Sequence, residues 1–156
     1  MRMLKEYSNA SLSSSIFSPV QENLRWMCDR KVADIICNFN RHYADHSGYL
    51  QSTTFTKEAL AADNEGNQIT FYDSNTGKAL FVAPNNRTMQ EFLDESKAHG
   101  WPSFRDDDVV WENCRCLKDG KTVSLDGTHL GHNLPDRNGK RYCINLVSVA
   151  GIPVEK

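Results

Sequence analysis

The chain has 156 residues, 39% of them hydrophobic, and its 18 basic and 20 acidic side chains give a formal net charge of −2. This length fits one domain with a sizeable core. The balanced charge argues against the basic face that nucleic acid requires, and no apolar run is long enough to span a bilayer. We therefore expect a single domain over residues 1–156, with no nucleic-acid or membrane partner.

The five cysteines do not fit a disulfide framework, because their spacing is irregular and an odd count leaves one thiol over. The N-terminus lacks the apolar segment of a secretory leader. We expect reduced thiols and a cytoplasmic location. Residues 1–15 are polar and serine-rich, which is typical of a loose terminus; a transit peptide there is the alternative.

A helix is predicted from residue 18 onward. Ser18 at the N-cap, Pro19 at the first helical position and Gln21 form a capping box. Apolar residues then recur every three or four positions, which favours one buried helical face. They are Leu24, Cys28, Val32, Ile35, Ile36, Phe39 and Tyr43.

This helix ends at Ser47-Gly48 at the latest. His42 and His46, four residues apart, fit a solvated helix end better than a metal pair, since no third ligand stands nearby. A shorter helix is predicted from Thr56 to Ala62, closed by residues 64–66. Residues 18–65 therefore form a predicted helical extension.

The remainder, residues 66–151, is predicted to be mainly β. Thr88, with Glu91 three residues later, marks one further helix that closes near Gly100. The expected strands are 68–72, 79–82, 109–117, 122–125 and 141–149, with turns at 73–77, Asp119-Gly120 and Asn138-Gly139. The predicted fold class is α+β, mainly β, with the N-terminal helices packed on the β unit.

The last predicted strand gathers polar chemistry on one face. Side chains alternate along a strand, so Tyr142, Ile144 and Leu146 point to the core, whereas a second set points away from it. That second set is Arg141, Cys143 and Asn145. A neighbouring cation stabilises a thiolate and lowers the pKa of a cysteine. The structural alternative is a small buried cysteine beside two surface polar residues.

Two further segments are candidates for chemistry. His129 and His132, with Asp136 four residues later, fit metal ligands or acid/base groups whose imidazole tautomer Asp136 fixes. Gly131 between them allows close backbone approach or a positive φ. Trp101, fixed between Gly100 and Pro102, fits a pocket wall or a core position.

Taken together, these segments resemble the methionine-R-sulfoxide reductases, the B class of peptide methionine sulfoxide reductases. The motifs match in order and approximate spacing, over residues 66–151. They are Gly100-Trp101-Pro102-Ser103-Phe104, His129-Leu130-Gly131-His132 with Asp136, and Arg141-Tyr142-Cys143-Ile144-Asn145; residues 76–81 resemble the first hairpin of the family.

The resemblance implies two antiparallel sheets and reduction of methionine-R-sulfoxide in proteins through a sulfenic acid on the nucleophile. It assigns Cys143 as that nucleophile, Trp101 and Phe104 to substrate binding, and thioredoxin or a small thiol as reductant. The other catalytic positions fall on His129, His132, Asp136, Arg141 and Asn145.

The sequence departs from the family in two places. Asp73, Thr76, Val123 and Asp126 stand where many members carry four zinc-binding cysteines, so we expect neither structural zinc nor another cofactor. The turn at 73–75 and the added helices must then stabilise that end. Residues 97–99 replace the common resolving cysteine, which leaves Cys114 or Cys116, or direct attack by an external thiol, to reduce the sulfenic acid.

Two alternatives belong to other functional classes. One is a non-catalytic binding module on the same β scaffold, because fold does not fix function. The other is a mononuclear metal site made by His129, His132 and Cys143.

Overall fold

The computed structural model describes residues 19–39, 53–64, 68–137 and 139–153. Its elements are η2 (Arg25–Met27), α2 (Arg30–Phe39), α3 (Phe55–Asn64), β1 (Ile69–Tyr72), β2 (Ala79–Ala83), α4 (Met89–His99), β3 (Ser103–Phe104), η4 (Asp106–Asp108), β4 (Cys114–Cys116), β5 (Lys121–Ser124), β6 (His129–Asn133), β7 (Tyr142–Ile144) and η5 (Leu146–Ser148).

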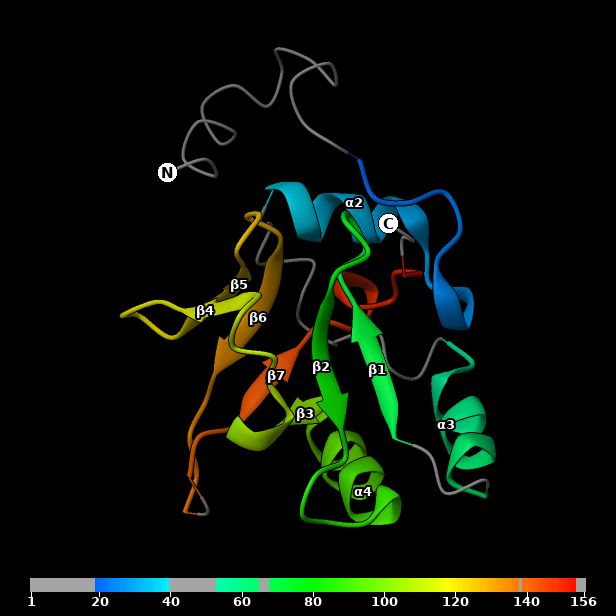
Figure 1. Cartoon of the computed structure of the whole chain (residues 1–156), viewed down its shortest axis with the longest axis vertical. Coiled ribbons are helices and arrows are strands. Elements are labelled where there is room, and N and C mark those ends of the chain that lie inside the picture. Colours follow the sequence, from blue (N-terminus) through cyan, green and yellow to red (C-terminus); the bar gives the residue numbers. More distant parts are fainter. Residues whose placement is uncertain (1–18, 40–52, 65–67, 138, 154–156) are drawn as a thin grey trace.

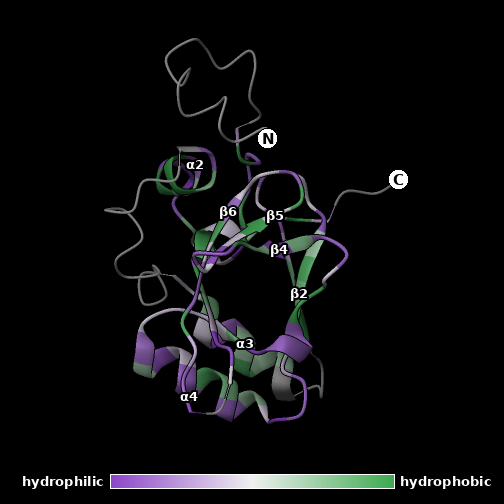
Figure 2. Ribbon diagram, turned by 90° about the vertical axis from the view of Figure 1, so that its left-hand side faces the viewer, coloured by the Kyte–Doolittle hydropathy of each residue, from purple (hydrophilic) through white to green (hydrophobic). Residues whose placement is uncertain are grey.

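The strands form two antiparallel sheets. The first is the hairpin of β1 and β2, and the second has five strands in the order β3-β7-β6-β5-β4. Figures 1 and 2 show α2 at one end of the molecule and α3 and α4 at the other, with the sheets between them. The predicted α+β, mainly β class with two antiparallel sheets is therefore confirmed.

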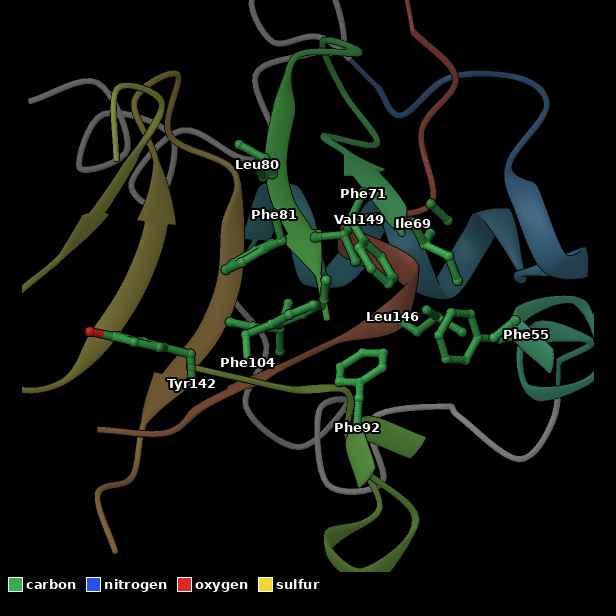
Figure 3. Close-up of a cluster of buried hydrophobic side chains, with 14 of the residues drawn as sticks. Phe55, Ile69, Phe71, Leu80, Phe81, Phe92, Phe104, Tyr142, Leu146 and Val149 are labelled. Carbon is green, nitrogen blue, oxygen red and sulfur yellow. The ribbon is translucent and has the colours of Figure 1, made fainter. Parts of the chain in front are cut away.

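An aromatic cluster fills the space between the sheets and the helices (Figure 3). Phe104 on β3 stacks on Phe81 of β2 with ring centroids 4.2 Å apart. Phe71 of β1 meets the ring of Phe104 edge-on, with centroids 4.9 Å apart. Phe92 brings α4 into this cluster and Phe55 brings in α3. Burying each phenylalanine contributes about 1.5–3 kcal/mol, so this cluster fixes how the helices sit on the sheets.

Figure 2, coloured by hydropathy, shows β2 hydrophobic along its length. The helices that cover the core are amphipathic: in α4, Phe92 and Leu93 are buried whereas Glu91 and Asp94 are exposed. Among the described helices, none combines the length and the apolar character needed to cross a membrane.

The first helix starts later than predicted. Residues 19–24 form no α-helix; the amide of Gln21 instead donates to the carbonyl of Ser74. Trp26 adopts a positive φ of 59° and places its ring 5.0 Å from that of Phe55, which breaks any helical path. α2 begins at Arg30, where the carboxylate of Asp29 accepts hydrogen bonds from the amides of the first turn.

The buried face of α2 also differs in part from the predicted stripe. Ile36 is fully buried as expected, but its buried neighbours are Ala33 and Cys37, which pack against Val147 of η5. Val32 and Ile35 are only half-buried. The predicted loose terminus, Tyr43, the pair His42 and His46, and the end at Ser47-Gly48 lie outside the described residues.

Local signals predicted α4 and the hairpins well. The side chain of Thr88 accepts from the amide of Glu91, whose carboxylate accepts in return from the amide of Thr88, and Gly100 closes the helix with a φ of 86°. The predicted strand 141–149 is shorter in the structure, because the chain turns into η5 after β7. The predicted strand 109–117 is reduced to β4.

Polar side chains meet near the β1–β2 turn in what we call the Asp73 cluster, made of Asp73, Asn75, Ser124, Thr128 and Asn38. Asp73 is 0% exposed, and the hydroxyl of Thr128 lies 2.9 Å from its carboxylate. Asn75 donates to Thr128 and to Asn38 of α2, each at 3.0 Å. Both the turn and the added helix therefore stabilise this end, as the sequence suggested.

Candidate active site

The strand β7 presents one residue away from the core. Tyr142 and Ile144 are 1% and 0% exposed within the aromatic core, and Cys143 between them faces the other side. Cys143 pairs with Ser103 of β3 and with His132 of β6. Directly paired residues project to the same face, so a hydroxyl and an imidazole flank this thiol.

A β-bulge in β6 brings both histidines to the face of Cys143. Gly131 pairs with Thr122, but the next pairing along β6 joins His129 to Val123, which leaves Leu130 as an extra residue. In a regular strand, residues three apart such as His129 and His132 would point to opposite faces, and the bulge shifts the alternation so that they share one. With the bulge, their ring centroids are 5.6 Å apart.

Gly131 allows β6 to lie close to β7. A Cβ atom added at this glycine would stand 2.0 Å from the carbonyl oxygen of Cys143 and 2.9 Å from the Cα of Ile144. Any side chain there would force the two strands apart. Of the two predicted reasons for a glycine at this position, close approach is the one that the structure bears out.

Arg141 contacts the thiol directly, as its place on the predicted strand suggested. Its Nη1 lies 2.6 Å from Sγ of Cys143, and both side chains are buried. Burial raises the pKa of Cys143, whereas the charge and hydrogen bond of Arg141, together with a hydrogen bond from Ser103, lower it. Burial outweighs these contributions, so the pKa of Cys143 lies above its ordinary value, opposite to the net shift expected from the cation.

The other thiols have different surroundings. Burial raises the pKa of Cys28 and of Cys114 to about 12 and that of Cys37 well above its ordinary value. All five cysteines are free. In the described part of the chain, Cys143 is the cysteine that a guanidinium contacts through a hydrogen bond. Cys28, predicted to lie in a helix, precedes α2 instead and is half-buried.

Asn145 and Asp136 lie at the two ends of the site. The backbone amide and the Nδ2 of Asn145 both donate to the carbonyl of Leu130, at 2.8 and 3.0 Å, which ties the end of β7 to the bulge. Asp136 forms a two-pronged ion pair with Arg105, and its Oδ2 lies 3.7 Å from Nε of Arg141. Its predicted action on a histidine tautomer remains a prediction.

Trp101 and Phe104, from the motif at residues 100–104, lie in different surroundings. Trp101 follows the helix-closing Gly100 and is half-buried, two residues before Ser103 of the site. Phe104 is 0% exposed and stacks in the core, because it pairs with Tyr142 and shares the inward face of β7. Phe104 therefore faces the core, and Ser103 occupies the face of Cys143 in its place; the substrate-binding role of Phe104 stays a prediction that this position does not favour.

Cys114 and Cys116 do not approach Cys143. Pairing runs from Cys116 to Thr122, Gly131 and Ile144, so Cys116 shares the core face of Ile144, opposite to Cys143. Cys114, two residues away, shares that face and donates to the carbonyl of Leu80. β4 is also three strands from β7, about 14 Å at the usual strand spacing, whereas a disulfide requires Cα atoms within roughly 7 Å. Both are therefore poorly placed as resolving thiols.

Metal coordination has no support among the described residues. Within that part of the chain, no three His, Cys, Asp or Glu side chains gather so that they could hold a metal ion. Where the family resemblance would put cysteines, Asp73 belongs to the Asp73 cluster, and Asp126 forms an ion pair with Lys78 at 3.2 Å.

Three residues near the site were not predicted: Ser103, Glu95 and Arg105. Ser103 pairs with Cys143, and the negative charge of Glu95 on α4 raises the pKa of the thiol. Arg105 holds both Glu95 and Asp136. The pairing of β3 with β7 and the docking of α4 bring them together, and no motif or periodicity in the sequence signals either.

Comparison of the chain with models of protein families finds no family that matches. Comparison with solved structures likewise finds no match.

Proposed function

We propose that this protein reduces methionine-R-sulfoxide in proteins to methionine, on the fold type of the methionine-R-sulfoxide reductases. The observation that carries the proposal is the 2.6 Å contact between Arg141 Nη1 and Cys143 Sγ, on a strand face that also holds His129 and His132. A thiolate beside a guanidinium is a nucleophile, and two imidazoles on the same face are proton donors and acceptors.

The reaction transfers one oxygen atom to the thiol. The Sγ thiolate of Cys143 attacks the sulfoxide sulfur and forms a sulfur–sulfur bond. The oxygen takes up a proton and moves to Sγ as its bond to the substrate sulfur breaks, and the sulfur–sulfur bond breaks with its electron pair staying on the methionine sulfur. The products are methionine and a cysteine sulfenic acid, so the sulfoxide is reduced by two electrons and the thiol is oxidised by two. Two external thiols then return Cys143 to its reduced state, giving one disulfide and one water.

Protonation of the departing oxygen favours this step, because a bare oxide is a poor leaving group. His132 pairs directly with Cys143 across the sheet, and His129 is its neighbour through the bulge. Either imidazole suits proton delivery to the sulfoxide oxygen. Arg141 stabilises the thiolate before attack, and Asn145 fixes the bulge that holds the imidazoles.

Selection of the R epimer follows from a site with unlike walls. Trp101 offers an apolar surface for the methyl group of the substrate, whereas His129, His132 and Ser103 are polar. One configuration at sulfur then directs the methyl group to the indole and the oxygen to the donors. The opposite configuration exchanges them and leaves a polar oxygen on an apolar wall.

The test is turnover of each resolved epimer of N-acetylmethionine sulfoxide with dithiothreitol, followed by chromatography of the methionine product. The R epimer should turn over and the S epimer should not. Trp101→Ala should lower kcat/KM while the melting temperature stays close to that of the wild type. Trp111→Ala is the matched control, since Trp111 is 43% exposed and packs on Tyr142, whose side chain faces away from Cys143. Absence of turnover for both epimers would overturn the proposal.

The second candidate is a non-catalytic binding module, and one observation favours it. Cys143 is only 6% exposed, and burial raises the pKa of its thiol. Under this alternative the protein would bind sulfoxide peptides with measurable affinity and release them unchanged. The epimer assay separates the two functions, because only an enzyme consumes the substrate.

A further inference from the structure

The side chain of Arg105 binds the turn before β7 at several points. This turn contains Asp136, Gly139 and Lys140 and leads directly into Arg141. Arg105, which follows β3, donates from Nη1 to the carbonyl of Lys140 at 3.2 Å and to Oδ1 of Asp136 at 3.1 Å. Its Nη2 donates to Oδ2 of Asp136 at 3.0 Å. Arg105 therefore fixes both the backbone and the carboxylate of this turn.

The same guanidinium also binds Glu95 of α4. Glu95 in turn binds Arg87 at 2.7 Å, and Arg87 reaches Asp108 at 2.7 Å and the carbonyl of Ser103 at 3.0 Å. Arg141 joins through its 3.7 Å ion pair with Asp136. Three arginines and three carboxylates thus form one partly buried network near Cys143. Its formal charge is zero when all six groups are ionised, so removal of any member leaves an unbalanced charge close to the thiol.

The geometry of the network keeps the positive charge of Arg141 next to Cys143. Arg105 occupies both oxygens of Asp136, and Asp136 stays 3.7 Å from Nε of Arg141, which is beyond hydrogen-bond range. Nε of Arg141 therefore forms a long ion pair with Asp136 and no hydrogen bond, and its Nη1 donates to Sγ of Cys143. Planar guanidinium groups suit such two-pronged carboxylate binding better than lysine does.

We propose that Arg105 is a positioning residue for the nucleophile: by holding Asp136 and Glu95, it keeps the guanidinium of Arg141 on Cys143. Loss of Arg105 allows Asp136 to pair closely with Arg141 and removes one of the two arginines that balance Glu95, whose negative charge raises the pKa of the thiol. Both effects disfavour the thiolate. The reductase function proposed above enters only the kinetic part of this inference.

The test measures alkylation of Cys143 by iodoacetamide against pH, by mass spectrometry of its peptide. Among the described residues, the charged and titratable groups around the thiol include Arg141 with Asp136, His129 and His132 of β6, Lys121 of β5 paired with His132, and Glu95 of α4, and Ser103 of β3 adds a hydroxyl. Both imidazoles are present in every variant compared. Arg105→Gln should raise the pH midpoint of alkylation by about half a unit to one unit, and Glu95→Gln should lower it.

The opposite signs separate positioning by charge from a merely structural role. Arg105→Gln and Glu95→Gln break the same ion pair, so a structural role alone would lower both melting temperatures and shift both midpoints alike or not at all. The double variant should return close to the wild-type midpoint. Arg115→Gln, which removes the same charge from the exposed face of β4, should leave the midpoint unchanged.

Arg105→Lys keeps the charge without the fork, and its midpoint should lie between those of the wild type and Arg105→Gln. If Arg105→Gln does not fold, the required result is the lower midpoint of Glu95→Gln; an unchanged or higher midpoint overturns the proposal.

In the epimer assay, Arg105→Gln should lower kcat several-fold at pH 7 and leave KM nearly unchanged. Alkylation needs no sulfoxide turnover, so inactivity with shifted midpoints would remove the reductase function and retain this role of Arg105.

Discussion

The Asp73 cluster and the Cys143 site each bury a group that can carry a negative charge, but they give it different partners. Asp73 is 0% exposed and Cys143 is 6% exposed, and burial raises the pKa of both. The groups that lower the pKa of Asp73 are uncharged donors, namely the amide of Asn75 and the hydroxyls of Thr128, Ser124 and Thr76. The group that most lowers the pKa of Cys143 is the guanidinium of Arg141.

The difference indicates separate roles. Uncharged donors satisfy the lone pairs of a carboxylate and fix the turn that carries it, which contributes to stability. A guanidinium stabilises a thiolate that has lone pairs left for attack. Changes at Asp73 should therefore alter folding without altering chemistry, and changes at Cys143 and Arg141 should do the reverse.

The largest effect should follow from Cys143→Ser. This nearly isosteric change removes the nucleophile, so sulfoxide reduction should fall by about three orders of magnitude or more. Thermal unfolding should remain close to that of the wild type, since the Asp73 cluster and the aromatic core are untouched. Wild-type turnover by this variant, measured in the epimer assay, would show that Cys143 is not the nucleophile.

Asp73→Ala should lower the free energy of unfolding by about 2–4 kcal/mol, because Thr128 and the amide of Asn75 lose a buried acceptor. Urea unfolding followed by tryptophan fluorescence measures the change. The kcat of the folded fraction should match the wild type. A loss of kcat without a loss of stability would contradict the division between the two regions.

Arg141→Gln should raise the pH midpoint for alkylation of Cys143 and lower kcat/KM at pH 7 by about tenfold, since the thiolate loses its cation. Arg141→Lys should recover part of both, because it restores charge without the planar fork. If Arg141→Gln leaves the alkylation profile unchanged, the guanidinium has no part in activation of the thiol.

Asp73→Asn tests how the stability contributed by the Asp73 cluster depends on pH. Burial raises the pKa of Asp73, so its contribution to stability is full below the pKa of an unfolded aspartate, about 3.9, and is lost as pH rises through the raised value. The stability of the wild type relative to Asp73→Asn should therefore fall as pH increases above about 4.

Asp119→Asn provides the control of opposite sign. The amide of Lys121 lowers the pKa of Asp119, so its contribution is present above the unfolded pKa and is lost as pH falls. Urea midpoints from pH 3 to 8 for the three proteins measure both slopes. Equal slopes for the two variants would contradict the assignment at Asp73.

The smallest effect should follow from Cys114→Ala with Cys116→Ala, since neither thiol shares a face with Cys143. After one equivalent of sulfoxide without reductant, dimedone should label Cys143 in this double variant and in the wild type to the same extent. Mass spectrometry measures the label. A quantitative disulfide from Cys143 to Cys114 or Cys116 in the wild type would require a rearranged sheet.

Local patterns predicted what depends on local chemistry. The capping box at Thr88 and Glu91 needs only its own turn, and the alternation along β7 places Arg141 beside Cys143 through strand geometry. The predicted helix start at Pro19 failed because the burial of Trp26 against Phe55 and Phe71, residues distant in sequence, decides the path of the chain there.

Contacts made across the sheet could not be predicted in the same way. The placement of Phe104 in the core depends on its register with Tyr142, and the role of Arg105 depends on where α4 docks. For the same reason, the sequence could not show whether Cys114 or Cys116 lies near Cys143, because that depends on the strand order.

The bulge at Leu130 has a consequence for protein engineering. Both histidines share a face with the thiol because β6 carries one residue more than β5 opposite it. Two histidines placed three residues apart in a regular strand would reproduce the motif and still turn one imidazole to the other face. Transplanting the site into another sheet therefore requires copying a backbone irregularity, and a graft that matches only residue identities would carry the complete motif without its geometry.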